Sequence, residues 1–461
     1  MAQVNTMQCA GRSVLVIGAG LTGVSAARFL QASGCAVRLA DSRDLPPGRA
    51  ALAQLPEPVP CHFGAWNPAA LTGVDEVLVS PGVAPDHPAL VAARAVGLPI
   101  YGDIELFARH AVRPVLAVTG TNGKSTVASL TAALLKASGV QAALGGNIGV
   151  PALDLLDGPE PDCYVLELSS YQLETVSSLR GHSAAVLNFT PDHLDRYGTV
   201  AAYGEAKARI LTGARRVVLN SADPWVAALA EQLAPHQTLV RFADAAPRTD
   251  RDFGVERDGD TLWLMRGGER LLAADRLPLP GGHNRANVLA ALALASDMAA
   301  DWAALIRGVT TFKPLAHRLQ RVGQAAPAWW NDSKATNVAS AIAAIEAVAE
   351  TGAKPLVLIA GGLGKGQDFT PLADAVRGRV ESAVLLGASR EELARTLGQV
   401  CQTRLADSIE QAVAIAAELA APAGAVLLAP ACASQDQFRD YADRGDRFAE
   451  AVAQYAAEAD R

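Results

Sequence analysis

A glycine-rich segment in the first third of the chain has the residue types of a phosphate-binding loop. It reads Thr119-Gly120-Thr121-Asn122-Gly123-Lys124-Ser125-Thr126. In such loops backbone N–H groups surround the phosphates, the lysine reaches the β and γ oxygens, and the serine hydroxyl can ligate Mg²⁺. The usual spacing would place a glycine at position 118, where this chain has valine, so the loop is a variant form. Its place between an apolar strand and a helix predicts ATP binding by residues 120–126.

Side chains that could complete a nucleotide site follow further along. Glu167 ends an apolar strand over residues 164–166, where a carboxylate would face the phosphates and their Mg²⁺. Asp192-His193 comes soon after another strand, although the pair would serve equally well as a turn and helix cap. Lys207 falls in a polar helix over residues 201–210, and a lysine so placed is more often solvated than catalytic.

A second glycine motif lies near the start of the chain. Gly18-x-Gly20-x-x-Gly23 follows the strand 13–17 and opens a helix, and Asp41 ends the next strand. This is the dinucleotide fingerprint in its usual context, in which glycines let the backbone approach a diphosphate at a helix N-terminus. The residues alone leave three interpretations open: NAD, another diphosphate such as a UDP-sugar, or a tight turn without a ligand.

Short apolar strands alternate with helix-like stretches along the whole chain, which predicts parallel sheets with ligands at the C-terminal ends of the strands. A length of 461 residues suits three domains. We expect an α/β protein with a Rossmann-like domain over residues 1–112, a central parallel sheet of P-loop ATPase type over 113–313, and a second Rossmann-like domain over 314–461. Residues 241–277 are expected to form a small antiparallel excursion, and a helix over 283–300 to close the central domain.

Composition excludes several classes of protein. The net charge is −7 without a run of Lys or Arg, which argues against nucleic-acid binding. The most apolar later stretch, residues 288–306, contains Asp297 and Asp301, so we expect a buried helix and no membrane span. The six cysteines are scattered and are expected to be reduced and buried. With no secretory signal at the start, these features predict a cytoplasmic protein, which we expect to be a monomer.

Taken together, the motifs resemble the Mur ligase family, whose members use ATP to extend the peptidoglycan peptide. The resemblance covers essentially the whole chain. Four segments carry it in the central domain: Thr119 to Thr126, Glu167 to Leu173, Asn188 to Tyr197, and Gly282-His283-Asn284-x-x-Asn287.

Within the family, the last third of the chain is most similar to members that add D-glutamate. The similar segments are residues 331–337, 361–365 and 431–438, with Arg444-Gly445. The Asn-Pro-Arg motif of members that add diaminopimelate or lysine does not occur in that domain. The resemblance therefore implies a ligase that joins UDP-N-acetylmuramoyl-L-alanine to D-glutamate through an acyl phosphate, with release of ADP and phosphate.

The resemblance also implies a role for particular residues, and it favours a UDP-sugar over NAD at the first glycine loop. The UDP-substrate residues would be Leu21, Thr22, Asp41, Ser42, Arg43, Gly82 and Asn147. Asn284, Arg318 and Asp332 would join residues 120–126 around ATP. The incoming amino acid would contact Thr336, Lys365, Ser434 and Tyr441. The catalytic residues would be Lys124, Asn147, His193 and Lys207.

Two Mg²⁺ ions are implied in the same way. One would use Ser125 and Glu167, and the other Glu167, His193 and Lys207. A lysine ammonium cannot ligate a metal, so the resemblance implies that Lys207 is carbamylated by CO₂. That reaction needs the neutral amine, which burial near other cations would favour.

Two positions depart from the family pattern. Gln320 replaces the acid of the usual His-Arg-x-Glu, and Tyr441 stands where phenylalanine is common. Three alternatives also have to be weighed. An NAD-dependent dehydrogenase leaves Lys124 and Glu167 unexplained, and a folylpolyglutamate synthase usually lacks a separate UDP-binding first domain. A non-catalytic phosphate-binding protein would not need Lys124, Glu167, His193 and Lys207 together.

Overall fold

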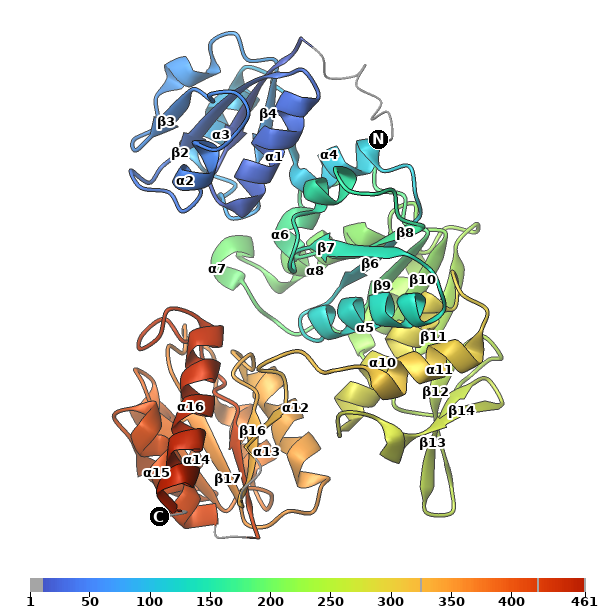
Figure 1. Ribbon diagram of the computed structural model, residues 1–461, viewed down its shortest axis with the longest axis vertical. Helices are drawn as coiled ribbons and strands as arrows, with labels where there is room; N and C mark the ends of the chain where they lie inside the picture. Colours follow the sequence, from blue (N-terminus) through green and yellow to red (C-terminus); the bar gives the residue numbers. More distant parts are fainter. Residues whose placement is uncertain (1–10, 324–325, 421–422, 460–461) are drawn as a thin grey trace. The chain divides into compact units, whose positions relative to one another are not determined.

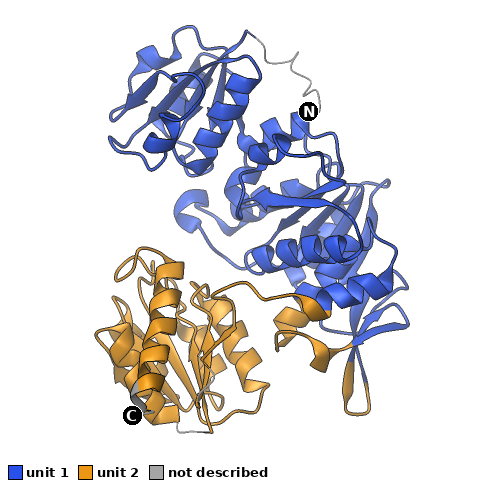
Figure 2. Ribbon diagram, viewed as in Figure 1, with its two compact units in different colours: residues 1–257, 263–272, 287–309 blue, residues 258–262, 273–286, 310–461 orange. Residues whose placement is uncertain are grey.

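The computed structural model describes residues 11–323, 326–420 and 423–459. Its strands form sheets of five, nine and six strands, with helices between them (Figure 1). This arrangement confirms the predicted α/β fold class. The chain divides into two compact units: residues 1–257, 263–272 and 287–309 make the first, and residues 258–262, 273–286 and 310–461 the second (Figure 2).

The first sheet is parallel throughout and has the order β3-β2-β1-β4-β5. Two of its strands, β3 and β5, have three residues each, too few for a recognisable pattern in the sequence. The strands are β1 (Ser13–Ile17), β2 (Ala36–Asp41), β3 (Cys61–Phe63), β4 (Glu76–Val79) and β5 (Ile100–Gly102). The helices are α1 (Leu21–Ala32), α2 (Arg49–Leu52), α3 (Pro88–Ala95) and α4 (Asp103–His110).

The nine-stranded sheet has the order β14-β13-β12-β11-β10-β9-β6-β8-β7. Its strands are β6 (Val115–Thr119), β7 (Ala142–Gly146), β8 (Cys163–Glu167), β9 (Ser183–Val186), β10 (Arg216–Asn220), β11 (Thr238–Phe242), β12 (Phe253–Asp258), β13 (Thr261–Arg266) and β14 (Glu269–Ala273). Its helices are α5 (Lys124–Ala137), α6 (Ser170–Leu173), α7 (Leu194–Tyr197), α8 (Val200–Ala208), α9 (Pro224–Ala228), α10 (Gly282–Ala295) and α11 (Trp302–Thr311).

Strand β6 lies between β8 and β9 and runs parallel to both. All five of its residues are buried, so the apolar run that preceded the phosphate loop in the sequence is a central strand. The carboxyl ends of β6, β8 and β9 therefore meet at one edge of the sheet, where the phosphate loop follows β6 and Glu167 ends β8.

Residues 241–277 contain β12, β13 and β14, three consecutive strands joined by short turns that extend the edge of the central sheet. One expectation for this region was wrong. The helix expected over 283–300 ends at Ala295, and α11 begins at Trp302. The Asp301 carboxylate accepts a hydrogen bond from the Ala304 N–H at 3.0 Å, and this cap starts the new helix.

The six-stranded sheet has the order β15-β16-β20-β17-β18-β19 and is parallel except for the β15–β16 pair. Its strands are β15 (Gln320–Val322), β16 (Ala328–Asn331), β17 (Leu356–Gly361), β18 (Ser382–Leu386), β19 (Gln402–Leu405) and β20 (Ala425–Leu428). Its helices are α12 (Val338–Ala349), α13 (Thr370–Val376), α14 (Arg390–Leu397), α15 (Ile409–Ala420) and α16 (Tyr441–Ala459).

Two expectations from composition concern the fold as well. Among the residues that the structure describes, no helix combines the length and apolar character needed to cross a membrane. The five described cysteines are free thiols; three are buried, Cys401 is half-buried and Cys61 is exposed. Cys9 lies outside the described residues. The expectation of burial holds for Cys35, Cys163 and Cys432, is met only in part for Cys401, and fails for Cys61.

Candidate active site

The phosphate loop connects β6 to α5 in a conformation that its glycines permit. Gly120 has φ +157° and Gly123 has φ +81°, and α5 begins at the next residue, Lys124. The Lys124 ammonium donates to the carbonyl oxygens of Gly120 and Thr121, at 3.0 and 2.9 Å. The lysine is therefore folded over its own loop, at the N-terminus of a helix whose dipole favours anions.

Asn188, just after β9, braces this loop. Its side-chain oxygen accepts the Asn122 N–H at 2.8 Å, and its amide donates back to the Asn122 carbonyl at 3.0 Å. The Tyr203 hydroxyl lies 3.3 Å from that of Thr121. The sequence reasoning assigned no role to Asn188 or Tyr203. The only signal for Asn188 was its place at a strand end inside a family-like segment.

Glu167 ends β8 beside the loop and is almost fully buried, with 2% exposure. One carboxylate oxygen accepts the Asn147 side-chain amide at 2.9 Å. The other, Oε2, is buried and has no hydrogen-bond partner among the described residues. A buried carboxylate oxygen without a partner is costly unless a cation or donor is bound there. Asn147 and Glu167, which were predicted as site residues separately, are in contact, and one Glu167 oxygen is left as an acceptor for a ligand.

Lys207 is buried and is not the solvated lysine of the simpler interpretation, because only 1% of the residue is exposed. Its ammonium donates to the Gly120 carbonyl at 2.7 Å and lies 4.7 Å from the centre of the Tyr203 ring. Burial, and then the nearby Lys124 charge, hold the pKa of Lys207 well below its usual range. This site therefore favours the neutral amine, which is the reactive form of a lysine.

His193 begins α7 in a left-handed conformation, with φ +54°. Its Nδ1 lies 2.9 Å from the Tyr171 hydroxyl, and its Nε2 lies 3.8 Å from an Asp192 carboxylate oxygen. Burial lowers the pKa of His193, and the Lys207 and Lys124 charges act in the same direction, although the Asp192 charge opposes them. The shift favours the neutral imidazole, which is the form that ligates a metal, and it shows that His193 belongs to the same cluster as the two lysines.

The side chains around the phosphate loop fit a Mg²⁺ whose shell is completed by phosphates and water. In the part of the chain that the structure describes, no three His, Cys, Asp or Glu side chains are grouped closely enough to hold a metal by themselves. Mg²⁺, however, usually takes one or two protein oxygens and completes its shell with phosphates and water. The unpartnered Glu167 oxygen, with a nearly buried Ser125 in the loop, suits a Mg²⁺ that arrives with a nucleotide.

The first glycine loop uses its three glycines differently. A Cβ atom on Gly23 would lie 1.8 Å from the Gly18 carbonyl oxygen, and one on Gly18 would lie 2.8 Å from the Ser80 Cβ. These two glycines are needed for the turn itself. A Cβ on Gly20, in contrast, would meet no atom within 4 Å. The fold itself would therefore accept a side chain at Gly20, and the glycine leaves open space at the start of α1.

The Asp41 carboxylate is fully engaged by hydrogen bonds from neighbouring residues. Its carboxylate accepts the Ala19 N–H at 2.7 Å and the Arg43 N–H at 2.9 Å, and it pairs with the Arg43 guanidinium at 2.7 and 2.8 Å. The Arg43 hydrogen bonds lower the pKa of Asp41 to about 2. Asp41 therefore shapes the loop, and its engagement argues against the ribose contact that a dinucleotide fold would require of it.

The other predicted residues of this loop lie at its surface. Leu21 is 78% exposed, an unusual state for a leucine at the first position of a helix. Ser42 and Gly82 are exposed and Thr22 is half-buried. An exposed leucine beside Gly20 offers an apolar surface next to a helix N-terminus, whose dipole favours anions.

In the second unit, three predicted loops follow three adjacent strands. Asp332 follows β16, Ser434 comes soon after β20, and Lys365 follows β17, and these strands are neighbours in the order β16-β20-β17. Because the strands are parallel, their carboxyl ends bring the three segments to one edge of the sheet. Ser434 is buried, Lys365 is exposed and Thr336 is half-buried.

Burial raises the pKa of Asp332 to about 7, although the Arg318 charge acts in the opposite direction. The predicted pair Arg318 and Asp332 is thus close enough to interact. Asn284 is buried at the start of α10, where its side-chain amide donates to the Pro280 carbonyl at 2.7 Å. Gln320 accepts the His317 N–H through its side-chain oxygen at 3.0 Å, and an amide oxygen makes this bond as a carboxylate would.

Tyr441 begins α16, and the Lys334 ammonium lies 4.0 Å from the centre of its ring. The main-chain oxygen of Tyr441 accepts the Ser333 hydroxyl at 2.7 Å. The buried Arg444, one turn further on, donates to the Ser333 carbonyl at 2.9 Å and the Cys432 carbonyl at 3.1 Å. Arg444 was seen in the sequence only as part of a segment. The structure makes it the brace between two of the predicted loops.

Comparison with known proteins places these features in a family. Three domain families match: "Mur ligase MurD-like, N-terminal domain" over residues 12–102, "Mur ligase middle domain" over 118–295, and "Mur ligase, glutamate ligase domain" over 317–432. A UDP-N-acetylmuramoylalanine–D-glutamate ligase of Nitrosococcus oceani is 45% identical over 446 residues, covering 96% of this chain and 97% of its own. The protein of the same name from Aromatoleum aromaticum is 43% identical over 458 residues, covering 95% and 96%.

Among solved structures, a UDP-N-acetylmuramate–alanine ligase from Thermotoga maritima superposes with a TM-score of 0.60. It is 20% identical, and the match covers 97% of this chain and 99% of that protein. At this identity the similarity concerns the fold, and it extends over all three sheets.

Proposed function

The chain belongs to the Mur ligase family, and from this premise we propose that it is the ATP-dependent ligase that adds D-glutamate to UDP-N-acetylmuramoyl-L-alanine. Similarity over 95–96% of the chain to two ligases named for this reaction supports the substrates. The observation that carries the chemistry is the cluster of Lys124, Glu167 and Lys207 around one phosphate loop.

The reaction has to make a carboxylate electrophilic in water. A carboxylate oxygen of the alanyl group attacks the γ-phosphorus of ATP, which forms an acyl phosphate as the bond to ADP breaks. The glutamate amine then attacks the carbonyl carbon, phosphate leaves, and the amine nitrogen loses a proton. Because two anions must meet in the first step, catalysis depends on neutralising charge and on positioning.

The phosphate loop would supply both the neutralisation of charge and the positioning of the phosphates. Residues 120–126 would bind the phosphates through backbone N–H groups, and Lys124 would turn from its loop carbonyls toward the β and γ oxygens. Mg²⁺ would add Lewis-acid neutralisation of the phosphate charge when bound, and Ser125 and Glu167 are the residues that would hold it. Asn147, which already positions Glu167, would contact the substrate carboxylate or the phosphate in transfer.

Lys207 would act as a carbamate. The neutral amine attacks the carbon of CO₂, a nitrogen–carbon bond forms, and loss of a proton leaves an oxygen-donor anion. The depressed pKa of Lys207 supports this step, because it leaves the amine unprotonated at a higher fraction near neutral pH. With Glu167 and His193, the carbamate would complete a second Mg²⁺ site.

The first glycine loop would bind the UDP part of the substrate. The open space at Gly20 and the start of α1 suit a diphosphate, and the exposed Leu21 would contact the nucleoside. Thr22, Ser42, Arg43 and Gly82 lie in segments that start at the carboxyl ends of the adjacent parallel strands β1, β2 and β4, and they would contact the same substrate. Asp41 would act indirectly, by holding Ala19 and Arg43 in place.

In the second unit, Asn284, Arg318 and Asp332 would contact ATP, and Thr336, Lys365, Ser434 and Tyr441 would contact D-glutamate. The exposed Lys365 ammonium is a suitable partner for a glutamate carboxylate. We further propose functional domains over residues 1–112, 113–313 and 314–461, in a monomeric protein of the cytoplasm.

Phosphate release from Mg-ATP and UDP-N-acetylmuramoyl-L-alanine tests the assignment, with D-glutamate, L-glutamate or no amino acid. We expect release with D-glutamate and at most a few per cent of that rate in the other two reactions. A Glu167→Gln variant should lose at least about 100-fold in turnover, because it removes the negative charge that would hold the Mg²⁺ at the phosphates. Release with L-glutamate alone would contradict the specificity, and no release in any reaction would contradict the ligase activity.

A further inference from the structure

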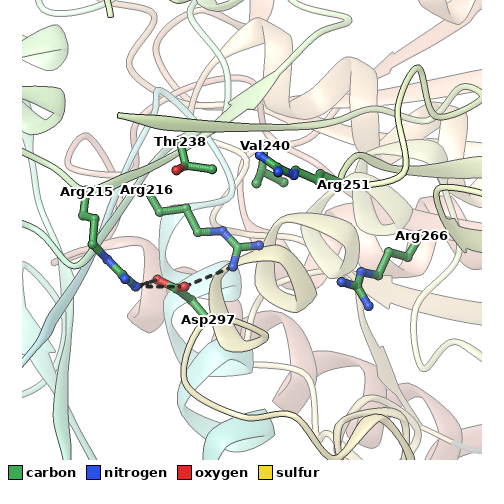
Figure 3. A pocket seen from close by; sticks show the side chains of 7 residues that line it. All are labelled: Arg215, Arg216, Thr238, Val240, Arg251, Arg266 and Asp297. Atoms are coloured by element: carbon green, nitrogen blue, oxygen red, sulfur yellow. Dashed lines mark hydrogen bonds and ion pairs between the residues drawn. The ribbon is translucent and has the colours of Figure 1, made fainter. Parts of the chain in front are cut away.

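A charged cavity lies in the first unit, at the central sheet. Its volume is about 370 Å³, and Figure 3 shows the side chains that line it. They are Arg215, Arg216, Thr238, Val240, Arg251, Arg266 and Asp297. Arg216 and Thr238 are the first residues of the parallel strands β10 and β11 and are partners in register. The cavity is therefore at the amino ends of these strands, whereas the phosphate loop lies at the carboxyl edge of the same parallel part of the sheet, with a strand length of roughly 17 Å for five residues between the two edges.

The lining is strongly basic. Four guanidinium groups face one carboxylate, Asp297, and this carboxylate is already engaged. It pairs with Arg215 at 3.1 Å and Arg216 at 3.3 Å, and it accepts the Ser183 hydroxyl at 2.8 Å. His182 lies 3.0 Å from it as well. Asp297 can thus offset one of the four positive charges, which leaves a local excess of three.

The other two arginines have no acidic partner in the part of the chain that the structure describes. The Arg266 guanidinium lies over the Trp302 ring, 4.9 Å from its centre, and the Arg251 side chain makes no hydrogen bond or ion pair with a described residue. In Figure 3 the dashed interactions all meet at Asp297 and none reaches Arg251 or Arg266.

Arg216 shows most directly that grouping these arginines is energetically unfavourable. Its Nε atom is buried and has no hydrogen-bond partner among the described residues, while its other nitrogens bond Ser296 and Asp297. Burial, and to a smaller extent the Arg266 and Arg215 charges, lower the pKa of Arg216. Buried unpartnered donors among like charges are unfavourable, and a bound anion would relieve both conditions.

We propose that this cavity is a binding site for a small phosphorylated anion, separate from the nucleotide and UDP sites. Planar guanidiniums match phosphate oxygens in paired hydrogen bonds, and Arg251 and Arg266 are the two that have such bonds to give. The volume suits a diphosphate or a small phosphate ester and is at the lower end of the range for ligand pockets. Thr238 offers a hydroxyl at the same place.

Inorganic pyrophosphate is the probe, and Trp302 beneath Arg266 is the reporter. The full chain carrying Lys124→Ala, which weakens anion binding at the phosphate loop, is titrated without Mg²⁺ while tryptophan fluorescence is followed. We expect a saturable change that disappears in a Trp302→Phe variant. Adding Arg251→Gln and Arg266→Gln should weaken binding, measured by calorimetry, by about 100-fold, the scale of two lost charge-assisted contacts.

Arg257→Gln with Arg270→Gln is the matched control, because it removes the same charge from strands β12 and β14 outside the cavity. It should leave affinity within about threefold. Equal weakening in both double variants would show general attraction to a basic surface and would overturn the proposal. So would the absence of saturable binding in the Lys124→Ala chain. Neither result bears on the ligase reaction, which is tested by phosphate release.

Discussion

The ammonium of Lys207 lies 2.7 Å from the main-chain oxygen of Gly120, although the two residues are 87 positions apart in the chain. This contact connects α8 to the phosphate loop. It places an amine whose pKa is lowered next to the position expected for the phosphates. The same Gly120 oxygen accepts Lys124 at 3.0 Å. Two lysines on one carbonyl repel each other as cations, so conversion of one to an anion would stabilise the cluster.

Replacement of Lys207 by methionine tests the carbamate. Lys207→Met preserves the length and burial of the side chain but cannot react with CO₂. We expect turnover to fall at least about 100-fold, the scale of a lost electrostatic group, while affinity for ADP changes only a few-fold. In the wild-type chain, ¹³C-labelled bicarbonate should give a protein-bound carbonyl signal in the ¹³C NMR spectrum. The same signal in Lys207→Met, or near-normal turnover, would exclude the role.

Substitutions at Gly20 and Gly23 should have different effects, the first on substrate binding and the second on the stability of the fold. An added Cβ at Gly23 collides with the Gly18 carbonyl oxygen, whereas one at Gly20 meets nothing within 4 Å. Gly23→Ala should therefore lower the free energy of unfolding by about 1–3 kcal/mol or more. Gly20→Ala should change stability by less than about 0.5 kcal/mol but raise the KM for the UDP substrate about tenfold.

Urea denaturation and steady-state kinetics of both variants make the comparison. If Gly20→Ala and Gly23→Ala both changed the KM for the UDP substrate only slightly and to the same extent, no diphosphate would approach this loop. In that case the first glycine motif would be a tight turn alone.

Stability at acid pH should depend on Asp41. Its folded pKa of about 2 lies below the model-peptide value of 3.8, so its carboxylate stabilises the fold above pH 4. That contribution is lost as the pH falls from about 4 toward 2, where the unfolded chain takes up a proton first. Since the Arg43 side chain is 55% exposed and screened by water, we expect about 1 kcal/mol.

Unfolding of wild type and Asp41→Asn, compared at pH 7, 4 and 3, measures this contribution. The difference in unfolding free energy should be largest at pH 7 and shrink at pH 3. A difference that stays constant over this range would contradict the ion pair as its source.

The local parts of the site were predictable because consecutive residues encode them. The loop 120–126 follows a buried parallel strand and Glu167 is the last residue of another, and strand ends are visible in an apolar run. The burial of Lys207 could not be predicted from the sequence. Helix α8 has no strongly apolar face, and Gly120, the hydrogen-bond partner of Lys207, is distant in the chain. The arginine cavity was missed for a related reason. Arg251 and Arg266 belong to the segment 241–277, and only the pairing of its strands brings them to Arg216.

Tyr441 provides the test of the amino-acid site. The Lys334 ammonium lies 4.0 Å from the centre of its ring, and a phenyl ring would keep this cation–π contact. We therefore expect Tyr441→Phe to hold the KM for D-glutamate within about threefold. Tyr441→Ala removes the ring and releases Lys334, so KM should rise about tenfold or more, consistent with roughly 1–2 kcal/mol.

Tyr455→Ala, further along α16 and packed on Trp329, is the matched control. It should reduce thermal stability without a change in KM. A tenfold increase in KM for Tyr441→Phe would instead assign recognition to the hydroxyl group. The ring would then hold Lys334 only as part of the fold, and the departure from phenylalanine at this position would be what selects the amino acid.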